Sequence, residues 1–215
     1  MNLKEKMEKV ALFAKEKRDR AIIKNPDYSA RLIYRWQHTL RVAQYGKILA
    51  EKEGAEIEIV LIACLLHDIA KLSDRSRDVE HGRIGAKMVR PFLKEIGYSD
   101  EDAENICYAI ATHVDGKSDF EHPHTLEAKI VSDADKIDRF SNYRTTVALG
   151  KFANDDYESL ILAARKRLVR FQKARREIRI QTENGRKAFD EQISLQVVYM
   201  ERLIADYEIS VLPKI

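Results

Sequence analysis

The sequence predicts an all-α fold, and three observations support that prediction. Apolar residues recur at helical spacing from one end of the chain to the other. Glycine and proline are scarce, with 8 and 4 residues in a chain of 215. No stretch alternates apolar and polar residues for long enough to indicate a half-buried strand. Because 45% of the residues are hydrophobic, the chain can bury a sizeable core, and we expect one compact domain, a helical bundle over residues 1–215.

The first three helices follow from turn residues and from the apolar pattern. An amphipathic helix is predicted over residues 3–24, and it ends at Asn25-Pro26-Asp27 because proline bars helical continuation. A second covers residues 29–53 and ends at Gly54, the residue typical of a left-handed C-terminal cap. The third, over residues 56–72, is apolar nearly all round, which indicates the central buried helix of a bundle.

The rest of the chain alternates polar loops with further helices. Residues 73–80 are polar and predict a loop, and the helix that follows is expected to bend or restart at Pro91. Ser99 precedes Asp102 by three residues, which resembles a capping arrangement at a helix start. Residues 114–124 form a second predicted loop. The helices predicted here cover residues 81–96, 99–113, 125–138, 143–153, 156–180 and 185–208.

Composition excludes several classes of protein. The chain has no run of 18 uncharged apolar residues, so no membrane span is expected. The first 20 residues alternate charged and apolar side chains and do not resemble a secretory signal, so we expect a cytoplasmic location. Cys64 and Cys107 each lie in an apolar helical segment and are interpreted as buried core thiols. Neither adjoins a plausible base, and the chain has no GxSxG elbow and no glycine-rich phosphate loop, which disfavours serine, cysteine and P-loop chemistry.

A His-Asp pair closes the most apolar segment, where a carboxylate needs compensation. His67 and Asp68 follow directly after a run of apolar residues. Burying an unpartnered carboxylate costs several kcal/mol. A divalent cation is the strongest compensator, and imidazole with carboxylate is the ligand mix suited to manganese, iron, zinc or nickel. The pair therefore predicts a metal site.

Two further residues strengthen this prediction. His38 lies in a polar break at the start of an apolar helical pattern, and Asp135 is flanked by Ile130, Val131 and Ile137. Taken singly, His38 is more often a satisfied core or surface histidine, and Asp135 is more often a solvated helix residue. The interpretation as metal ligands depends on the residues occurring together.

These residues resemble the motif of the HD-domain metal-dependent phosphohydrolases. The motif has one His, a His-Asp pair and a distant Asp, which this chain matches at His38, His67-Asp68 and Asp135. The segments HDIAK and SDADKID are similar to those of small bacterial and archaeal HD hydrolases. The resemblance implies an HD-type helical bundle, with a metal-site core at about residues 29–153 and charged C-terminal helices at about 154–210 packed on it. One departure is RFSNYRTTVALG after the last motif, where Arg144 comes one turn early.

The resemblance also implies roles for neighbouring residues. Asp133 competes with Asp135, but the motif selects Asp135 as the ligand, so Asp133 is expected to orient a ligand. His81 and His113 occur where two-metal relatives carry extra histidines, so each is expected to bind a second ion or phosphate; a structural role at a helix end would also explain them. Lys71 lies one turn after His67 and is expected to contact phosphate. The alternative is an ordinary solvated lysine at a helix C-terminus, where positive charge is favourable.

The function implied is hydrolysis by a metal-dependent phosphohydrolase. The cofactor expected is one divalent ion, or two, of Mn, Fe, Ni, Co or Mg at His38, His67, Asp68 and Asp135. Asp68, Lys71, His81 and His113 are the expected catalytic residues, with Asp68 both a ligand and the acceptor of the water proton. The substrate implied is a nucleotide or another small phosphorylated metabolite. Residues that can line its pocket are Arg35, Trp36, Arg77, Arg83 and Arg144.

Two different functions also fit the sequence. A few members of the HD superfamily, which this chain resembles, hold two irons and oxidise organic substrates. The chain can therefore also be interpreted as a di-iron oxygenase. The alternative of a nucleotide- or nucleic-acid-binding module also stays open, because residues 165–179 contain eight basic residues and one acid, Glu177. Such a run is usually a solvated helix face, and it can also bind phosphate backbones. His122 and His124, in the second loop, are interpreted as exposed residues and not as ligands.

Overall fold

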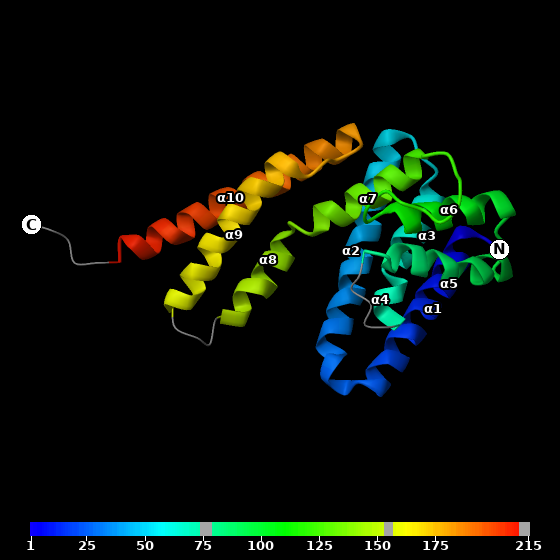
Figure 1. Ribbon diagram of the computed structural model, residues 1–215, viewed down its shortest axis with the longest axis horizontal. Helices are drawn as coiled ribbons and strands as arrows, with labels where there is room; N and C mark the ends of the chain where they lie inside the picture. The colour runs from blue at the N-terminus through cyan, green and yellow to red at the C-terminus, as the bar shows by residue number, and fades with distance from the viewer. Residues whose placement is uncertain (74–78, 153–156, 211–215) are drawn as a thin grey trace, which may run out of the picture. The chain divides into compact units, whose positions relative to one another are not determined.

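The computed structural model describes residues 1–73, 79–152 and 157–210, and within these ranges its regular elements are all helices (Figure 1). The predicted all-α class is confirmed. The chain divides into two compact units, residues 1–135 and residues 136–215. The packing of the C-terminal helices on the core stays a prediction.

Unit 1 begins with two long helices whose predicted bounds are confirmed. Helix α1 covers Leu3–Lys24. The Asn2 side chain accepts a hydrogen bond from the backbone N–H of Glu5, and the Glu5 carboxylate accepts one from the backbone N–H of Asn2, which forms a capping box. A short 3-10 helix, η1 (Pro26–Tyr28), leads into α2 (Ser29–Glu53). Gly54 ends α2 with φ 74°, the left-handed conformation that glycine adopts without strain.

The helix predicted over residues 56–72 is interrupted, and this part of the prediction is wrong. Helix α3 covers Ile57–Leu66 and α4 covers Ile69–Ser73, with His67 and Asp68 in a turn between them. The His67 ring nitrogen Nδ1 bonds the carbonyl of Cys64 at 2.7 Å. It thereby competes for the acceptor that the backbone N–H of Asp68 would use in a continuing helix. The His67-Asp68 pair thus lies at the end of α3.

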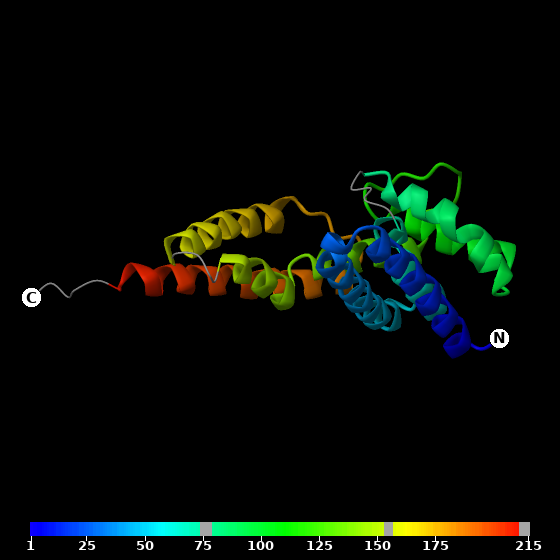
Figure 2. The same cartoon turned by 90° about the horizontal axis from the view of Figure 1, so that it is seen from below.

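Helices α5 (His81–Glu95) and α6 (Asp100–Thr112) form an adjacent pair (Figure 2). The restart predicted at Pro91 is wrong, because α5 runs through it. Pro91 is exposed, so water can satisfy the carbonyl that loses its partner, and the helix tolerates the ring. Ser99 caps α6 by accepting a hydrogen bond from Asp102 N at 3.1 Å, as predicted.

Helix α7 (Leu126–Asp138) is the last element that contributes to unit 1. Around the central α3 pack α1, α2 and α6. The fully buried side chains here include Ile62, Leu66, Ile106, Ile110 and Ile130. Cys64 and Cys107 are buried and free, which confirms their interpretation as core thiols. No described helix is long and apolar enough to cross a membrane.

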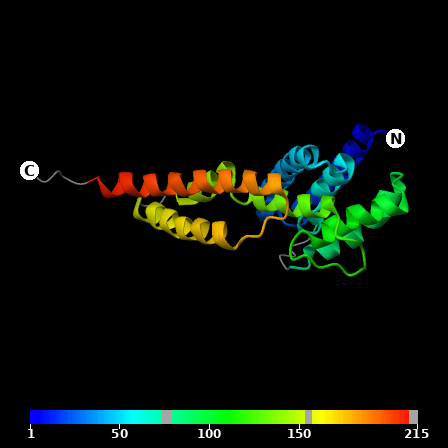
Figure 3. The same cartoon turned by 90° about the horizontal axis from the view of Figure 1, so that it is seen from above.

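Unit 2 contains α8 (Asn142–Leu149), the 3-10 helix η2 (Gly150–Phe152), α9 (Tyr157–Glu177) and α10 (Glu183–Glu208). Helices α9 and α10 lie side by side and antiparallel (Figures 1 and 3). Their core includes Phe140, whose ring meets those of Phe171 and Phe189 edge to face. The end predicted for α9 at residue 180 is three residues too late. Beyond this end, the side chains of Arg186 and Lys136 donate hydrogen bonds to the carbonyls of Ile178 and Arg179.

Candidate metal centre

His67 presents one ring nitrogen to the interior with its tautomer fixed. Its Nδ1 lies 2.7 Å from the carbonyl oxygen of Cys64, and because a carbonyl only accepts, Nδ1–H is the donor. The neutral ring therefore carries a lone pair on Nε2. The side chain is fully buried, and burial lowers the pKa of His67 although Asp68 and Asp135 oppose that shift. A neutral, oriented imidazole is the form that binds metal.

His113 repeats this arrangement at the end of α6. Its Nδ1 lies 2.7 Å from the carbonyl oxygen of Ile110, again three residues earlier. Ser132 on α7 donates its hydroxyl to the carbonyl of His113 at 3.0 Å, which ties the helix end to α7. The Nε2 atom of His113 is therefore also a lone-pair donor directed into the interior of unit 1.

Four predicted ligands converge from α2, the α3–α4 turn and α7. His38 Nε2 lies 3.3 Å from His67 Nε2 and 3.2 Å from Asp135 Oδ1. Asp68 Oδ2 lies 3.6 Å from both imidazole Nε2 atoms. All four side chains are buried, and the atoms of His38, His67 and Asp135 fall within the span that one ion can bridge. The donor set fits a divalent transition metal.

A second cluster shares Asp68 with the first. Its Oδ1 lies 3.1 Å from His81 Nε2 and 3.9 Å from His113 Nε2, and these two ring nitrogens are 3.1 Å apart. The buried Oδ1 accepts no well-aligned hydrogen bond from the residues that the structure describes. A carboxylate whose two oxygens face different histidine pairs has the donor pattern of a bridging ligand.

Two cations from the solvent side flank Asp68. Arg35 Nη1 lies 2.7 Å from Oδ2, and Lys71 Nζ lies 3.1 Å from Oδ1. Their side chains are 21% and 20% exposed, against 2% for Asp68. Burial alone would raise the pKa of Asp68, yet contacts with His67, His81 and these two cations hold it well below its usual range. Asp68 is therefore a carboxylate, and a phosphate approaching it would meet two positive charges.

Arg35 is the site residue that the sequence placed only among pocket-lining candidates. It precedes His38 by three residues on α2, and residues three apart lie on one helix face. That spacing is the signal that points to it. The sequence predicts that Lys71 points toward His67 and Asp68, and Lys71 does contact Asp68, although the helix is interrupted at these two residues.

Other candidates lie elsewhere. Asp133 is buried on α7 but belongs to neither cluster of candidate ligands among the described residues. His122 stacks on Tyr108, with ring centroids 4.7 Å apart, and His124 Nδ1 lies 3.3 Å from the Tyr108 hydroxyl.

Four further residues are expected from the sequence to line the substrate pocket. Arg83 pairs with Asp115 and Asp119. Trp36 is buried, Arg144 belongs to unit 2, and Arg77 lies outside the described residues.

Close helix packing at Gly82 places the two extra histidines. A Cβ atom at Gly82 would lie 2.7 Å from the carbonyl oxygen of Ala111 and 2.8 Å from that of Ile110, the acceptor of the His113 ring. Both neighbours are backbone atoms and yield little. The absence of a side chain at Gly82 thus lets α5 approach α6 closely enough for His81 and His113 to meet.

We expect Gly82→Ala to destabilise the protein, because the added methyl group forces α5 away from α6. Overpacking of this kind lowers the free energy of unfolding by about 1–3 kcal/mol. Urea unfolding followed by circular dichroism measures the change. Ile84→Ala, at an exposed position on the same helix, is the matched control. Equal stability of Gly82→Ala and the wild type would contradict the close approach.

The metal-free protein should lose stability in acid because of His113. Burial, followed by the nearby His67, lowers the pKa of His113 from 6.5 to about 3. Between pH 6.5 and about 3, His113 is protonated in the unfolded chain but not in the folded chain. The free energy of unfolding is therefore highest above pH 6.5 and falls as the pH drops toward 3. The slope from one such group is about 1.4 kcal/mol per pH unit. Urea melts of chelator-treated protein between pH 7 and pH 5 measure it.

A control separates His113 from the other titrating groups. His113→Gln removes the ring and should reduce the pH slope in that window, while His122→Gln, at a half-buried position outside the cluster, should leave it unchanged. Identical slopes in the wild type and His113→Gln would show that this ring is not held neutral by burial.

Comparison with known proteins matches the same region. A family model described as the HD domain matches residues 35–139. Ribonuclease Y of Alkaliphilus metalliredigens is 31% identical over 101 residues, which cover 47% of this chain and 19% of the relative. YpgQ of Bacillus subtilis is 32% identical over 107 residues, 48% of this chain and 49% of YpgQ. The match thus spans half or less of the length of these curated relatives.

Solved structures share the fold over most of the chain. A predicted HD superfamily hydrolase from an uncultured Thermotogales bacterium has a TM-score of 0.64 at 22% identity, covering 96% of this chain and 99% of that chain. YpgQ of Bacillus subtilis, solved in complex with ADP, has a TM-score of 0.64 at 20% identity, covering 96% of this chain and 97% of that chain. At these identities the likeness shows the helical architecture.

Proposed function

Because this chain belongs to the HD domain family, we propose that it is a metal-dependent phosphohydrolase that cleaves a phosphoester or phosphoanhydride with activated water. One observation carries the proposal. Buried imidazole and carboxylate groups of His38, His67, Asp68 and Asp135 meet beside Arg35 and Lys71, two cations that reach solvent. The first set is suited to a divalent ion and the second to phosphate.

His38, His67, Asp68 and Asp135 would hold the ion. When bound, a divalent cation supplies a hydroxide nucleophile near neutral pH and polarises a phosphoryl oxygen. Asp68 would accept the proton that the attacking water loses, since its carboxylate oxygens lie beside both clusters. No nucleophilic side chain is required, and both cysteine thiols are buried with raised pKa values.

The two cations would receive the phosphate. Arg35 and Lys71 contact different oxygens of Asp68. Each can stabilise charge that accumulates on phosphate oxygens during bond cleavage. His81 and His113 would either bind a second ion with Asp68 or donate to phosphate. Elemental analysis of carefully loaded protein separates these roles, because two ions per chain favour the first and one ion favours the second.

The proposed substrate is a nucleotide or another small phosphorylated metabolite. The complex of YpgQ with ADP supports a nucleotide. The match to ribonuclease Y supports a second candidate, a phosphodiester bond in RNA. A di-iron oxygenase and a binding module without catalysis compete with the hydrolase proposal, and the choice among them depends on turnover and on the metal that supports it.

A substrate screen tests the proposal. It would combine nucleoside mono-, di- and triphosphates, cyclic nucleotides, simple phosphoesters and short RNA with manganese, cobalt, nickel and magnesium. We expect release of phosphate, pyrophosphate or shorter oligonucleotides with at least one metal. Activity with manganese or magnesium would exclude the oxygenase, since oxygenases need redox-active iron. The absence of turnover with every metal would overturn the hydrolase proposal in favour of binding.

Lys71→Met should weaken catalysis without removing metal. The side chain is expected to contact phosphate oxygens, and losing a charged hydrogen bond lowers kcat/KM by about 10- to 100-fold. Steady-state kinetics on the best substrate and elemental analysis measure both quantities. Lys52→Met, an exposed lysine at the end of α2, serves as the control. Unchanged kinetics would remove Lys71 from the site.

A further inference from the structure

Positive charge is concentrated in one short segment of unit 2. Residues 165–179 carry eight basic residues and one acid, a net charge of +7 in a chain whose net charge is +3. The other 200 residues together therefore carry −4. Such asymmetry within a nearly balanced chain is the electrostatic footprint of a surface that meets a polyanion.

Helix α9 displays this charge on its solvent side. The helix buries Ile161, Ala164, Phe171 and Ala174. At 3.6 residues per turn, the opposite side carries five exposed basic residues within a span of 12 positions, a rise of about 16 Å. We call this set the basic face of α9, and it consists of Arg165, Lys166, Arg170, Lys173 and Arg176.

Most of the cations of this face form no ion pair with the residues that the structure describes. Arg165 pairs with Glu208, and Lys173 lies 3.7 Å from Glu177. In the described part of the chain, Lys166, Arg170 and Arg176 form no ion pair or hydrogen bond through their side chains. Like charges three or four residues apart destabilise a helix by a few tenths of a kcal/mol per pair. An anionic partner would remove that cost.

Helix α1 shows how this face differs from an ordinary solvated one. That helix also has eight basic residues, but it interleaves them with four acids. Arg18 pairs with Asp19, and Arg20 lies 3.9 Å from Glu16. The basic face of α9 contains no acid other than Glu177 beside it. Of its five cations, only Arg165 and Lys173 pair with an acid among the residues that the structure describes.

We propose that the basic face of α9 binds the phosphate backbone of nucleic acid. Cations about one turn apart can contact successive phosphates, and such contacts are independent of base sequence. A lipid surface fits less well, because the only large apolar side chains exposed on this side of α9 are Leu162 and Val169, and a membrane-bound helix needs a broad apolar face. The inference does not depend on the proposed hydrolase activity, since binding is measured directly.

Fluorescence anisotropy on the intact protein tests this binding. The probes are labelled 20-nucleotide single-stranded RNA, single-stranded DNA and duplex DNA, titrated between 50 and 300 mM salt and checked on a gel for integrity. The test variant combines Lys166→Gln, Arg170→Gln and Arg176→Gln. The matched control combines Lys4→Gln, Lys9→Gln and Lys24→Gln, which remove the same charge from exposed positions on α1.

We expect salt-sensitive binding by the wild type and by the control variant. Each phosphate contact on a single strand contributes about 0.7 to the slope of log affinity against log salt. Losing three contacts should lower that slope by about 2 and weaken binding about 100-fold at 100 mM salt. If the triple variant fails to fold by circular dichroism, each single replacement should still weaken binding about 5-fold.

Three results would overturn the proposal. They are no salt-sensitive binding by the wild type, an equal loss of affinity in the α9 and α1 triple variants, and binding to phosphatidylserine vesicles without binding to any oligonucleotide. The last would assign the basic face to a lipid surface. None of them affects the metal site, because hydrolysis is not measured.

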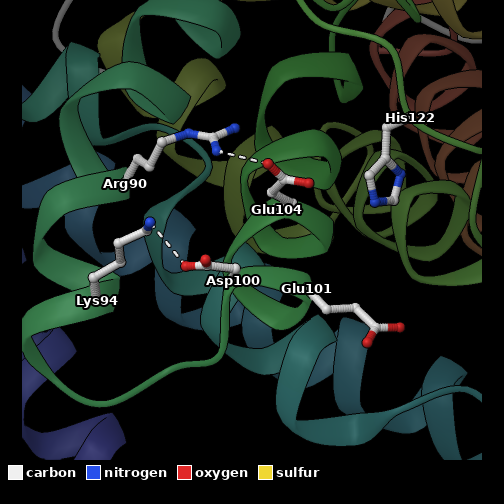
Figure 4. Close-up of a pocket in the computed structure, with 6 residues that line it drawn as sticks. All are labelled: Arg90, Lys94, Asp100, Glu101, Glu104 and His122. Atoms are coloured by element: carbon white, nitrogen blue, oxygen red, sulfur yellow. Dashed lines mark hydrogen bonds and ion pairs between the residues drawn. The ribbon is translucent and has the colours of Figure 1, made fainter.

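The pocket between α5 and α6 carries no comparable inference. It has a volume of about 310 Å³ and is lined by Arg90, Lys94, Asp100, Glu101, Glu104 and His122. Figure 4 shows Arg90 paired with Glu104 and Lys94 paired with Asp100, so its basic groups are already neutralised.

Discussion

We expect His67→Ala and Asp68→Ala each to abolish both bound metal and hydrolysis. His67 Nε2 lies within 4.0 Å of candidate ligand atoms of His38, Asp68 and Asp135, and Asp68 contributes one oxygen to each histidine pair. Removing either leaves the ion with too few ligands. Elemental analysis and turnover of the best substrate from the screen measure the two losses, which we expect to reach the detection limit together.

Controls separate metal loss from unfolding. Asp68→Asn keeps the size of the side chain and removes its charge, so it should lose metal while retaining the helical circular dichroism signal. His122→Ala replaces a histidine outside the cluster and should keep both metal and activity. Full metal content in His67→Ala and in Asp68→Ala would refute the assignment of this site.

The second large effect should distinguish two carboxylates on one helix. Asp135 Oδ1 lies 3.2 Å from His38 Nε2. Asp133 precedes it by two residues. Successive residues of an α-helix are rotated by about 100°, so side chains two residues apart differ by about 200° and point in nearly opposite directions. Loss of a group that orients a ligand weakens metal binding by roughly 10- to 100-fold. Asp133→Asn should therefore weaken metal binding by no more than this amount, and Asp135→Asn should weaken it by more.

Competition with a chelating metal indicator measures this difference. The isosteric replacements keep the volume of α7, on which both residues are buried. Thermal melts of the metal-free variants show whether folding is intact. If Asp133→Asn lost more affinity than Asp135→Asn, the ligand assignment would be reversed, and the motif match would have selected the wrong carboxylate.

Local signals in the sequence predicted most of the helices. The bounds of α1 and α2 follow from Pro26 and Gly54, which act through backbone restrictions that are the same in any fold. The failures have specific causes. The His67 ring captures the carbonyl of Cys64 and ends α3, and the exposed position of Pro91 lets α5 continue. Neither a ring rotamer nor the exposure of one carbonyl can be read from residue types.

The candidate metal site was likewise predicted only in part from the sequence. The HD motif named His38, His67, Asp68 and Asp135, and the spacing of further histidines named His81 and His113. Composition and periodicity alone left each of these a plausible core or surface residue. That they meet depends on α2, α5, α6 and α7 packing around the α3–α4 turn, which brings His38 and Asp135 within 3.2 Å although 97 positions separate them in the chain.

By itself the sequence determined the all-α class, most helix bounds and the identity of the candidate ligands, because these depend on local backbone preferences and on a recognisable order of residues. Only the tertiary structure decided that Asp68 faces both histidine pairs, that Arg35 and Lys71 flank it, and that α9 turns its unpaired cations to solvent. The physical reason is that side-chain direction, burial and distance between helices are set by packing, which no single segment specifies.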